Sequence, residues 1–515
     1  MAQELELKIL LDAAGAKRLR SRAAAVAEGP ERAISQTLRA IYYDTAEHAL
    51  SRRRIALRVR KEGRRWVQTL KLGGGVVGGL SHVEEWEAPA PGGRLDLGLI
   101  ADPAARAAVE EAAAGAPLGP VFETDFRRLL RLLPGPHGGS VELALDEGEI
   151  RANGEAAALT EAELELKSGD PRDLFAVARA LFPEGPIRFS RRNKAARGFD
   201  LAEGREAVAA LPAIIHAPPL ALDKGLTAEE AARDVLRHCL DQIAGNAAAA
   251  ALRDDPEAAH QLRVGLRRLR TAAALFRGPL GGPALAALAA EAKALADAAG
   301  AARDLDVLDE ELLAPLDPRD AGFATLRAAL AERREAKRAA LKARLAAPET
   351  AAFLFDLGAF TEGRGWLRPA DFEQTAALAA PVGDAAGAAL ETRWRKAAKL
   401  GDKVETLDHE ARHELRKRLK KLRYAVEFFA ALYPRKKVKP FLKRLKALQD
   451  DFGRLQDVAT ARALLLGPDA PAADDPAAQR AVGYALGRWE MEADAAFAEA
   501  RAHWAALAEA KPFWR

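Results

Sequence analysis

Two hydrophobic patterns divide the chain into an alternating half and a helical half. Up to about residue 203, apolar and polar residues alternate in short segments that Gly, Pro and Asn residues separate. Alternation with a period of two is typical of strands that bury one face. Helical patterns intervene near 101–114 and 171–182, which predicts an α+β domain. The alternation predicts strands at 4–9, 56–60, 67–72, 141–146 and 162–167.

The second half has a helical pattern almost to its end. Beyond about residue 225, leucine and alanine recur at spacings of three and four, the period of an amphipathic helix. Residues 204–224 are rich in alanine and proline, which indicates a linker. We expect breaks between helices at 278–283, 314–322, 363–371, 434–440 and 467–476.

An internal repeat runs through the helical half at a constant offset of 153 residues. It predicts two similar helical bundles, one over about 225–362 and one over about 372–515. The matched positions are His260 with His413, Arg263 with Arg416, Arg267 with Lys420, Arg270 with Arg423, Gly300 with Gly453 and Asp304 with Asp457.

Composition narrows the class of protein. The 515 residues allow two to four domains. The single cysteine, Cys239, excludes an intramolecular disulfide framework and a zinc–thiolate cluster. The longest charge-free stretch, about 207–222, contains three prolines and is too short to cross a bilayer. The acidic N-terminus does not resemble a signal peptide. We therefore expect a cytoplasmic protein without a membrane partner.

Charged residues occupy one face of most predicted strands. Glu4, Glu6 and Lys8 share a face of the first strand, and Arg58 and Arg60 share a face of another. One such strand would usually face solvent. Five strands with segregated signs favour instead a closed or nearly closed barrel with a charged lumen. Carboxylates suit a hard divalent cation and arginines suit phosphate oxygens, so the lumen fits a complex of a metal with a polyanion.

A basic face is predicted on one helix of each repeat. His260, Arg263, Arg267 and Arg270 fall within an arc of about 80°, and residues 412–446 contain fourteen Lys and Arg against two acids. Like charges at these spacings repel, which indicates a bound anion rather than a solvated face. Nucleic acid is an alternative partner, but the scarcity of aromatic residues argues against it. A metal at the histidines lacks further ligands at suitable spacing.

Motifs in the first 203 residues resemble, in order, the CYTH domain of triphosphate tunnel metalloenzymes. Glu4, Glu6 and Lys8 are similar to its ExExK signature. The other matches are Tyr43-Asp44-Thr45, Leu57-Arg58-Val59-Arg60, Lys71, Phe122-x-Thr124-x-Phe126-x-Arg128, Asp146-x-Gly148-x-Ile150, Glu161-x-Glu163-x-Glu165-x-Lys167-x-Gly169 and Lys194-x-x-Arg197-Gly198-Phe199.

This resemblance implies an eight-stranded antiparallel β tunnel with flanking helices that binds triphosphate with Mg²⁺ or Mn²⁺. Val83 stands where the family often has arginine, and Phe199 where it usually has tyrosine. The implied catalytic residues are Glu4, Glu6, Lys8 and Asp146. The implied metal ligands are Glu4, Glu6, Asp146, Glu161 and Glu163, with Glu165 as an alternative for one of the last two. The implied triphosphate ligands are Lys8, Arg58, Arg60, Lys71, Arg128, Lys194 and Arg197.

The helical half resembles a second family, the CHAD domain, over about 225–515. His260-Gln261-Leu262-Arg263-Val264 with 267–270 is similar to its HxxRV and RRLR motifs, and 300–306 to its GxxRDxD turn. Residues 423–427 and 449–457 resemble its second half. The resemblance implies two helical bundles that bind inorganic polyphosphate. The implied ligands are His260, Arg263, Arg267, Arg270, Arg303, His413, Arg416, Lys417, Lys420 and Arg423.

Together these features predict a CYTH domain at 1–203, a linker at 204–224 and a CHAD domain at 225–515. The predicted activity is metal-dependent hydrolysis of tripolyphosphate to phosphate and pyrophosphate, with long-chain polyphosphate bound by the helices. The expected location is the cytoplasm, with association to polyphosphate granules. Two alternatives stay open: a non-catalytic polyphosphate-binding or granule-associated protein, and an adenylate cyclase of the CYTH type.

Overall fold

The computed structural model describes residues 3–26, 33–73, 75–316 and 320–515. The chain forms two compact units. The first contains Met1–Ile214, Ala244–Arg253 and Ala346–Gly365, and the second contains Ile215–Ile243, Asp254–Leu345 and Trp366–Arg515. The predicted limits of the domains and of the linker stay a prediction.

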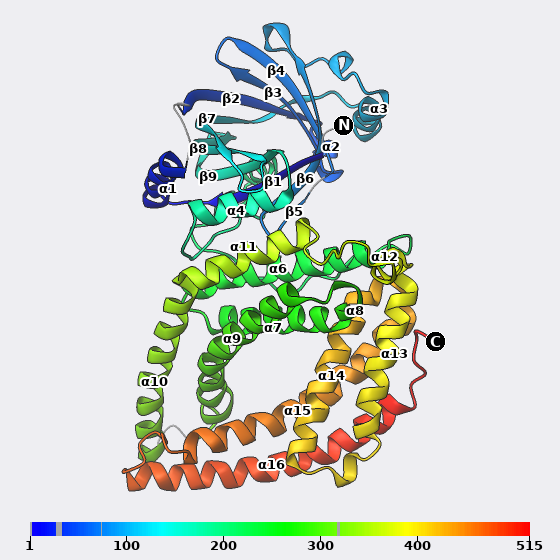
Figure 1. Cartoon of the computed structure of the whole chain (residues 1–515). Helices are drawn as coiled ribbons and strands as arrows, with labels where there is room; N and C mark the ends of the chain where they lie inside the picture. The colour runs from blue at the N-terminus through cyan, green and yellow to red at the C-terminus, as the bar shows by residue number, and fades with distance from the viewer. Residues whose placement is uncertain (1–2, 27–32, 74, 317–319) are drawn as a thin grey trace. The chain divides into compact units, whose positions relative to one another are not determined.

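Nine antiparallel strands in the described part of the chain form one sheet. Because β1 pairs with both β9 and β6, each of the long strands has two long neighbours and the sheet curls round on itself (Figure 1). The strands are β1 (Gln3–Leu10), β2 (Ile34–Asp44), β3 (Ile55–Glu62), β4 (Arg65–Leu72), β5 (Val76–Val77), β6 (Leu80–Pro89), β7 (Gly119–Pro134), β8 (Ser140–Ala152) and β9 (Glu155–Ser168).

The prediction of eight strands is therefore wrong in number. The additional strand is β5, two residues that pair only with β6. It lies within a glycine-rich segment, in which Gly73 before it and Gly78 and Gly79 after it adopt positive φ angles, and the tight reversal at Gly78 and Gly79 brings β5 back onto β6. The predicted alternation is present along β1, where Leu7 and Ile9 are buried on the face opposite Glu6 and Lys8.

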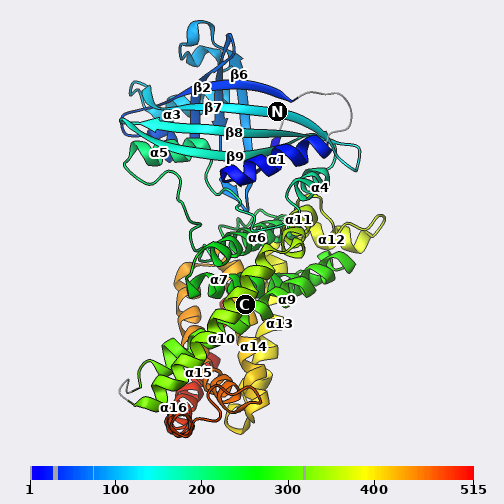
Figure 2. The ribbon, with the colours of Figure 1, turned by 90° about the vertical axis from the view of Figure 1, so that its left-hand side faces the viewer.

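Five helices connect and cover the sheet. Two of the longer ones begin with an Asp cap followed by proline: Asp102 accepts hydrogen bonds from the amides of Ala104 and Ala105, and Asp170 from that of Arg172. Figure 2 shows α5 at one end of β7–β9, and α1 with α4 at the other. The five are α1 (Ala13–Val26), α2 (Ala49–Arg52), α3 (Pro103–Ala113), α4 (Pro171–Leu181) and α5 (Lys194–Ala202).

The first unit also includes α11 (Pro348–Glu362), which lies far along the sequence. It packs against α4, where Gly358 allows close approach because an added Cβ would lie 2.2 Å from the Phe175 ring. Arg179 of α4 pairs with Asp356 at 3.0 Å. Residues 346–365 therefore fold with the β half, which sequence periodicity cannot reveal.

The second unit is helical. It contains α7 (Pro256–Leu275), α8 (Arg277–Leu280), α9 (Pro283–Asp306), α10 (Ala321–Ala346), α12 (Phe372–Ala379), α13 (Val382–Gly401), α14 (His409–Phe429), α15 (Arg435–Leu466), α16 (Pro476–Ala508) and the first part of α6 (Ala228–Leu252). The two-bundle repeat stays a prediction. None of the described helices is long and apolar enough to cross a membrane.

One predicted break is misplaced. The chain turns before α15 starts at Arg435, and α15 then continues through Pro440 to Leu466. Proline removes one backbone N–H donor, and here it lies in the second turn of a long helix that packs along α16. That packing stabilises the helix beyond the proline.

Candidate functional site

A cavity of about 740 Å³ lies inside the curled sheet. Strand alternation brings predicted residues from several strands to its wall. Those that line it are Glu6, Lys8, Arg58, Arg60, Lys71, Arg128, Glu163, Glu165 and Lys194. The side chain of Glu4 lies outside the described part of the structure. The predicted charged lumen thus corresponds to a real cavity within this unit.

Glu163 is the centre of the acidic part of the cavity. Its carboxylate lies 2.7 Å from Lys8 Nζ, 2.6 Å from Arg128 and 2.6 Å from Lys194 Nζ. Lys8 also pairs with Glu6 at 2.6 Å. Burial by itself would raise the pKa of Glu163, but Lys194, Lys8 and Arg128 hold that pKa well below its ordinary value. The carboxylate is therefore ionised at neutral pH.

Asp146 lies beneath this cluster and is fully buried. Arg128 donates two hydrogen bonds to it at 2.7 and 2.6 Å, and Lys194 lies 2.8 Å away. Although burial opposes ionisation, Lys194 and Arg128 lower the pKa of Asp146. Asp146 thus holds two cavity cations in place, and it is not among the residues that line the cavity.

Glu161 differs from its neighbours. It is fully buried, and Lys194 Nζ lies 3.3 Å from its Oε2. Among the described residues, its other oxygen, Oε1, has no hydrogen-bond partner. Burial raises the pKa of Glu161, in contrast to Glu163. A buried carboxylate oxygen without a partner is costly, which indicates a missing cation or proton donor at this position.

The basic part of the cavity lies on β3 and β4. Arg58 donates to the Tyr42 hydroxyl at 3.2 Å, Arg60 pairs with Glu87 at 3.3 Å, and Lys71 pairs with Glu85 at 3.0 Å. The Nε atoms of Arg58 and Arg60 are buried and have no hydrogen-bond partner in the part of the chain that the structure describes. Burial and the neighbouring Arg58 lower the pKa of Arg60. These two buried N–H donors indicate that an anion binds in this part of the cavity.

The donor chemistry fits a divalent cation that shares ligands with a phosphate. Carboxylate oxygens from Glu6, Glu161 and Glu163 gather at one end of the site, and one Glu161 oxygen lacks a partner. Among the described residues, no group of three or more His, Cys, Asp or Glu side chains forms a metal cluster. Mg²⁺ commonly takes one or two carboxylates and fills its shell with phosphate oxygens and water.

Three of the predicted site residues, Asp146, Glu161 and Arg197, do not line the cavity, and Arg197 has a structural role of its own. Arg197 is buried, and its guanidinium donates to the backbone oxygens of Arg192 and Ala207 and to the Ser190 hydroxyl. This placement favours a role in anchoring α5 rather than in phosphate contact. Val83, at the position where arginine was expected, lines the cavity with an apolar side chain.

Sequence reasoning gave no role to several residues of the cavity wall, among them Tyr42, Glu85 and Arg54. Tyr42 was missed because β2 has apolar residues on both faces. Glu85 follows the alternation of β6, but the alternation alone does not distinguish a cavity residue from a solvent-facing one. Arg54 has a φ of 58°, in the left-handed region, and precedes β3, so no periodic pattern could place its side chain.

In the helical unit, the basic faces of α7 and α14 act on one another. Lys420 is largely buried and interacts electrostatically with four nearby arginines, Arg416, Arg267, Arg263 and Arg423. Burial and these charges together lower the pKa of Lys420 to about 6. Burial and Arg263 similarly lower the pKa of Arg267 to about 10. The Nε of Arg416 is buried without a partner.

Other predicted members of the basic face already have partners. Arg263 pairs with Asp304 at 2.8 Å, Arg303 with Glu311, and Arg423 with Glu427 at 3.3 Å. His413 contacts Gln456. Burial lowers the pKa of His260, and the nearby arginines lower it further. Arg270 and Lys417 are exposed. The least neutralised part of the face is therefore the group Arg267, Arg416 and Lys420.

Comparison with known proteins matches both halves. The family model of the CYTH domain matches residues 2–199, and that of the CHAD domain matches residues 234–466. An inorganic triphosphatase from Haemophilus influenzae is 34% identical over 163 residues, which are 31% of this chain and 44% of that protein. The chain thus spans less than half of this relative. The crystal structure of the CHAD domain from the plant Ricinus communis is 32% identical and covers 57% of this chain and 97% of its own, with a TM-score of 0.50.

Proposed function

The chain belongs to the proteins that join a CYTH domain to a CHAD domain, and from this we propose that it is a metal-dependent inorganic triphosphatase with a polyphosphate-binding helical half. One observation carries the enzymatic part. The cavity is lined by two arginines whose buried Nε atoms have no partner among the described residues, and Glu161, buried behind the acidic part of the wall, has a carboxylate oxygen that likewise has no described partner. A triphosphate accompanied by a divalent cation would satisfy both.

Substrate binding exchanges ion pairs inside the cavity. Phosphate oxygens accept from the Nε atoms of Arg58 and Arg60, which have no partner in the free protein. Lys8, Arg128 and Lys194 turn from Glu163 towards the phosphates, and Lys71 turns from Glu85. Charge-assisted contacts to phosphate are among the stronger hydrogen bonds in proteins. The ion pairs of the free protein hold these cationic side chains near the positions in which they would bind phosphate.

Once released from their ion pairs, the carboxylates of Glu6, Glu161 and Glu163 would hold Mg²⁺ or Mn²⁺. Asp146 keeps the side chains of Arg128 and Lys194 in position. When bound, such a metal cation neutralises phosphate charge and lowers the pKa of a coordinated water. Glu165 is a weaker candidate because it pairs with Lys167 at 2.8 Å and is partly exposed.

Hydrolysis then needs positioning and charge neutralisation more than covalent catalysis. Water attacks the terminal phosphorus in line, the P–O bond to the bridging oxygen breaks, and the products are phosphate and pyrophosphate. Arg58, Arg60 and Lys71 lie on adjacent strands and hold the departing diphosphate. Lys8 and Lys194 keep their protons because nearby acids raise the pKa of each despite burial.

The helical half binds long-chain polyphosphate through the face formed by α7 and α14. The support is electrostatic: burial and the neighbouring charges of Arg416 and Arg267 lower the pKa of Lys420 to about 6. A polyanion relieves this repulsion directly.

The test is phosphate release from tripolyphosphate by the full chain, with Mg²⁺ and with Mn²⁺. Glu161→Gln should abolish metal-dependent release while the protein stays folded. Glu155→Gln provides the matched control, since Glu155 lies on the same strand and is exposed. Activity without added metal in a chelator, or full activity of Glu161→Gln, would overturn the proposal.

Parallel assays separate the alternatives. Cyclic AMP formation from ATP would indicate the cyclase. Retained polyphosphate binding without hydrolysis of any triphosphate would indicate a binding protein.

A further inference from the structure

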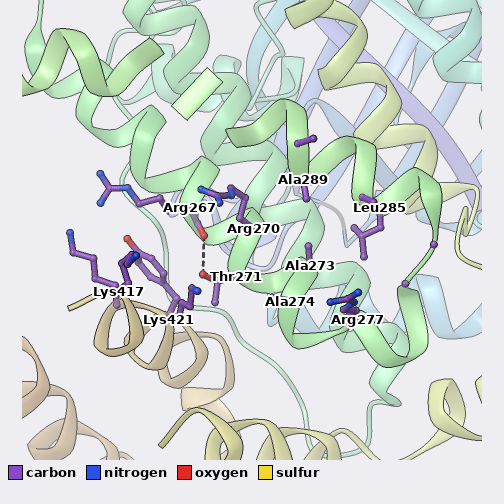
Figure 3. A pocket seen from close by; sticks show the side chains of 16 residues that line it. Arg267, Arg270, Thr271, Ala273, Ala274, Arg277, Leu285, Ala289, Lys417 and Lys421 are labelled. Carbon is purple, nitrogen blue, oxygen red and sulfur yellow. Dashed lines mark hydrogen bonds between the residues drawn. The ribbon is translucent and has the colours of Figure 1, made fainter. Parts of the chain in front are cut away.

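A second cavity, of about 750 Å³, lies within the helical unit, where α7, α8, α9 and α14 meet (Figure 3). Its volume is in the range of small-molecule sites. Cationic residues from three helices line it, and none of its lining residues is acidic. These cations are Arg267, Arg270, Arg277, Lys417, Lys420 and Lys421. The lining itself therefore carries a net positive charge, although Lys417 pairs with Glu414 at 2.9 Å, and the cavity extends beyond the basic face described above.

Most of the charged side chains lie towards one side of this cavity. In Figure 3, Arg267, Lys417 and Lys421 lie at one end, whereas Leu285 and Ala289 of α9 lie at the other. Further alanines from α7 and α9 complete the apolar wall: Ala273, Ala274, Ala286 and Ala290.

The apolar end has little hydrogen-bonding capacity. Thr271 donates its hydroxyl proton to the Arg267 carbonyl at 2.9 Å, so its hydrogen is used within α7. Arg277 is the one charged lining residue drawn near this end. A polyphosphate chain uses only cations and would leave the alanine wall without a matching group. A nucleobase needs partners for its polar edge, and this wall of described residues presents alkyl groups.

We propose that this cavity binds an anionic amphiphile, namely a phosphate or diphosphate monoester of an aliphatic alcohol. The phosphate group lies against Arg267, Arg270 and Lys420, and the chain follows the alanine surface of α9. Apolar chain burial supplies affinity that charge alone cannot. We take the ligand to be a free amphiphile, and the same phosphate group presented by a bilayer is the alternative that the experiment below separates. This site goes beyond the proposed function and does not depend on it.

Calorimetric titration of the full chain with butyl, hexyl and octyl phosphate, below their aggregation concentrations, tests the site. We expect affinity to rise by about threefold to fourfold for each added CH₂ that is buried. Inorganic phosphate should bind more weakly than all three, and octanol should not bind measurably. Equal affinity for butyl and octyl phosphate, or equal binding of octanol, would overturn the proposal.

Two neighbouring alanines of α9 give a matched pair of variants. Ala286 lines the cavity and Ala287 does not, and both are exposed. Ala286→Gln should remove most of the dependence on chain length, and Ala287→Gln should retain it. Ala290→Gln, at a second exposed lining position, repeats the test should Ala286→Gln unfold. Unchanged chain-length dependence in the folded lining variants would contradict the site.

Two further experiments are needed. One identifies whether the ligand is free or presented by a bilayer, and the other tests this site independently of the proposed function. Phosphatidylcholine vesicles containing phosphatidate present the same phosphate monoester in a bilayer. Binding to these vesicles without binding to octyl phosphate would overturn the free-amphiphile proposal. Polyphosphate is titrated separately: Ala286→Gln should leave its affinity unchanged, and failure of the wild type to bind it would count against the proposed function alone.

Discussion

The β cavity and the helical basic face both gather cationic side chains, but they differ in how these charges are neutralised. In the cavity, Lys8, Arg128 and Lys194 are neutralised by carboxylates within 3 Å. On the helical face, Lys420 lies among arginines, and its pKa falls to about 6. A ligand of the cavity must therefore exchange partners with existing ion pairs, so geometry decides what binds. A ligand of the helical face directly relieves the repulsion between its cations, so the charge of the ligand determines whether it binds.

Removal of the central carboxylate of the cavity should have the largest effect. Glu163→Gln leaves Lys8, Arg128 and Lys194 with less neutralisation. We expect triphosphatase activity to fall at least about 100-fold and the free energy of unfolding to fall by roughly 3–5 kcal/mol, as for other broken buried pairs. Steady-state phosphate release and denaturant unfolding measure the two effects.

The control for this variant is Glu155→Gln on the same strand, which should match the wild type in both measurements. An active and stable Glu163→Gln would mean that the cavity does not depend on its ion pairs, and the contrast between the two sites would disappear.

On the helical face, loss of one arginine should weaken polyphosphate binding by about tenfold to 100-fold, as expected for a charged hydrogen bond. Arg416→Gln is the variant of choice because its Nε is buried without a partner. Its control is Arg480→Gln on α16, whose guanidinium is exposed and lies 3.3 Å from Asp320. Fluorescence anisotropy with labelled polyphosphate measures the affinity of both variants. An affinity of Arg416→Gln equal to that of Arg480→Gln would argue against binding at this face.

Polyphosphate binding should also depend on pH through Lys420. The pKa of Lys420 is about 6 in the free protein, and a bound polyanion raises it, so binding takes up a proton above pH 6. Affinity should rise as the pH falls from about 8 to 6, by up to tenfold per unit, and level off below 6.

Lys420→Arg is the matched variant for this effect, because arginine keeps its charge over the whole range. The difference in slope between the two proteins isolates Lys420 from protonation of the ligand itself. Identical slopes would show that Lys420 is already charged in the free protein.

The smallest expected effect on stability distinguishes Glu161 from Glu163. Burial raises the folded-state pKa of Glu161 above its unfolded value, so its ionised form destabilises the fold at pH 7, and stability recovers as the pH falls through the folded pKa. Glu161→Gln should therefore raise the free energy of unfolding by about 1 kcal/mol while abolishing activity. Thermal unfolding checks the sign, and a destabilised Glu161→Gln would mean that the site is fully compensated without ligand.

Strand alternation was sufficient to predict most of the charged residues of the cavity wall. Glu6, Lys8, Arg58 and Arg60 line the cavity because a period of two sends every second side chain to the same face. The same logic missed β2, where apolar residues occupy both faces, and β5, whose two residues are too few for any pattern. It also could not separate Arg197, which anchors backbone oxygens, from the arginines of the cavity.

What the sequence alone determined is local: which residues share a face, and where the acidic and basic faces occur. The tertiary structure decided which faces meet. Lys8 and Glu163 are 155 residues apart and become partners only because β1 pairs with β9. Likewise, the depressed pKa of Lys420 requires α14 to lie beside α7. Periodicity sets the direction of a side chain within its element, whereas desolvation and charge coupling depend on distances between elements that no local pattern encodes.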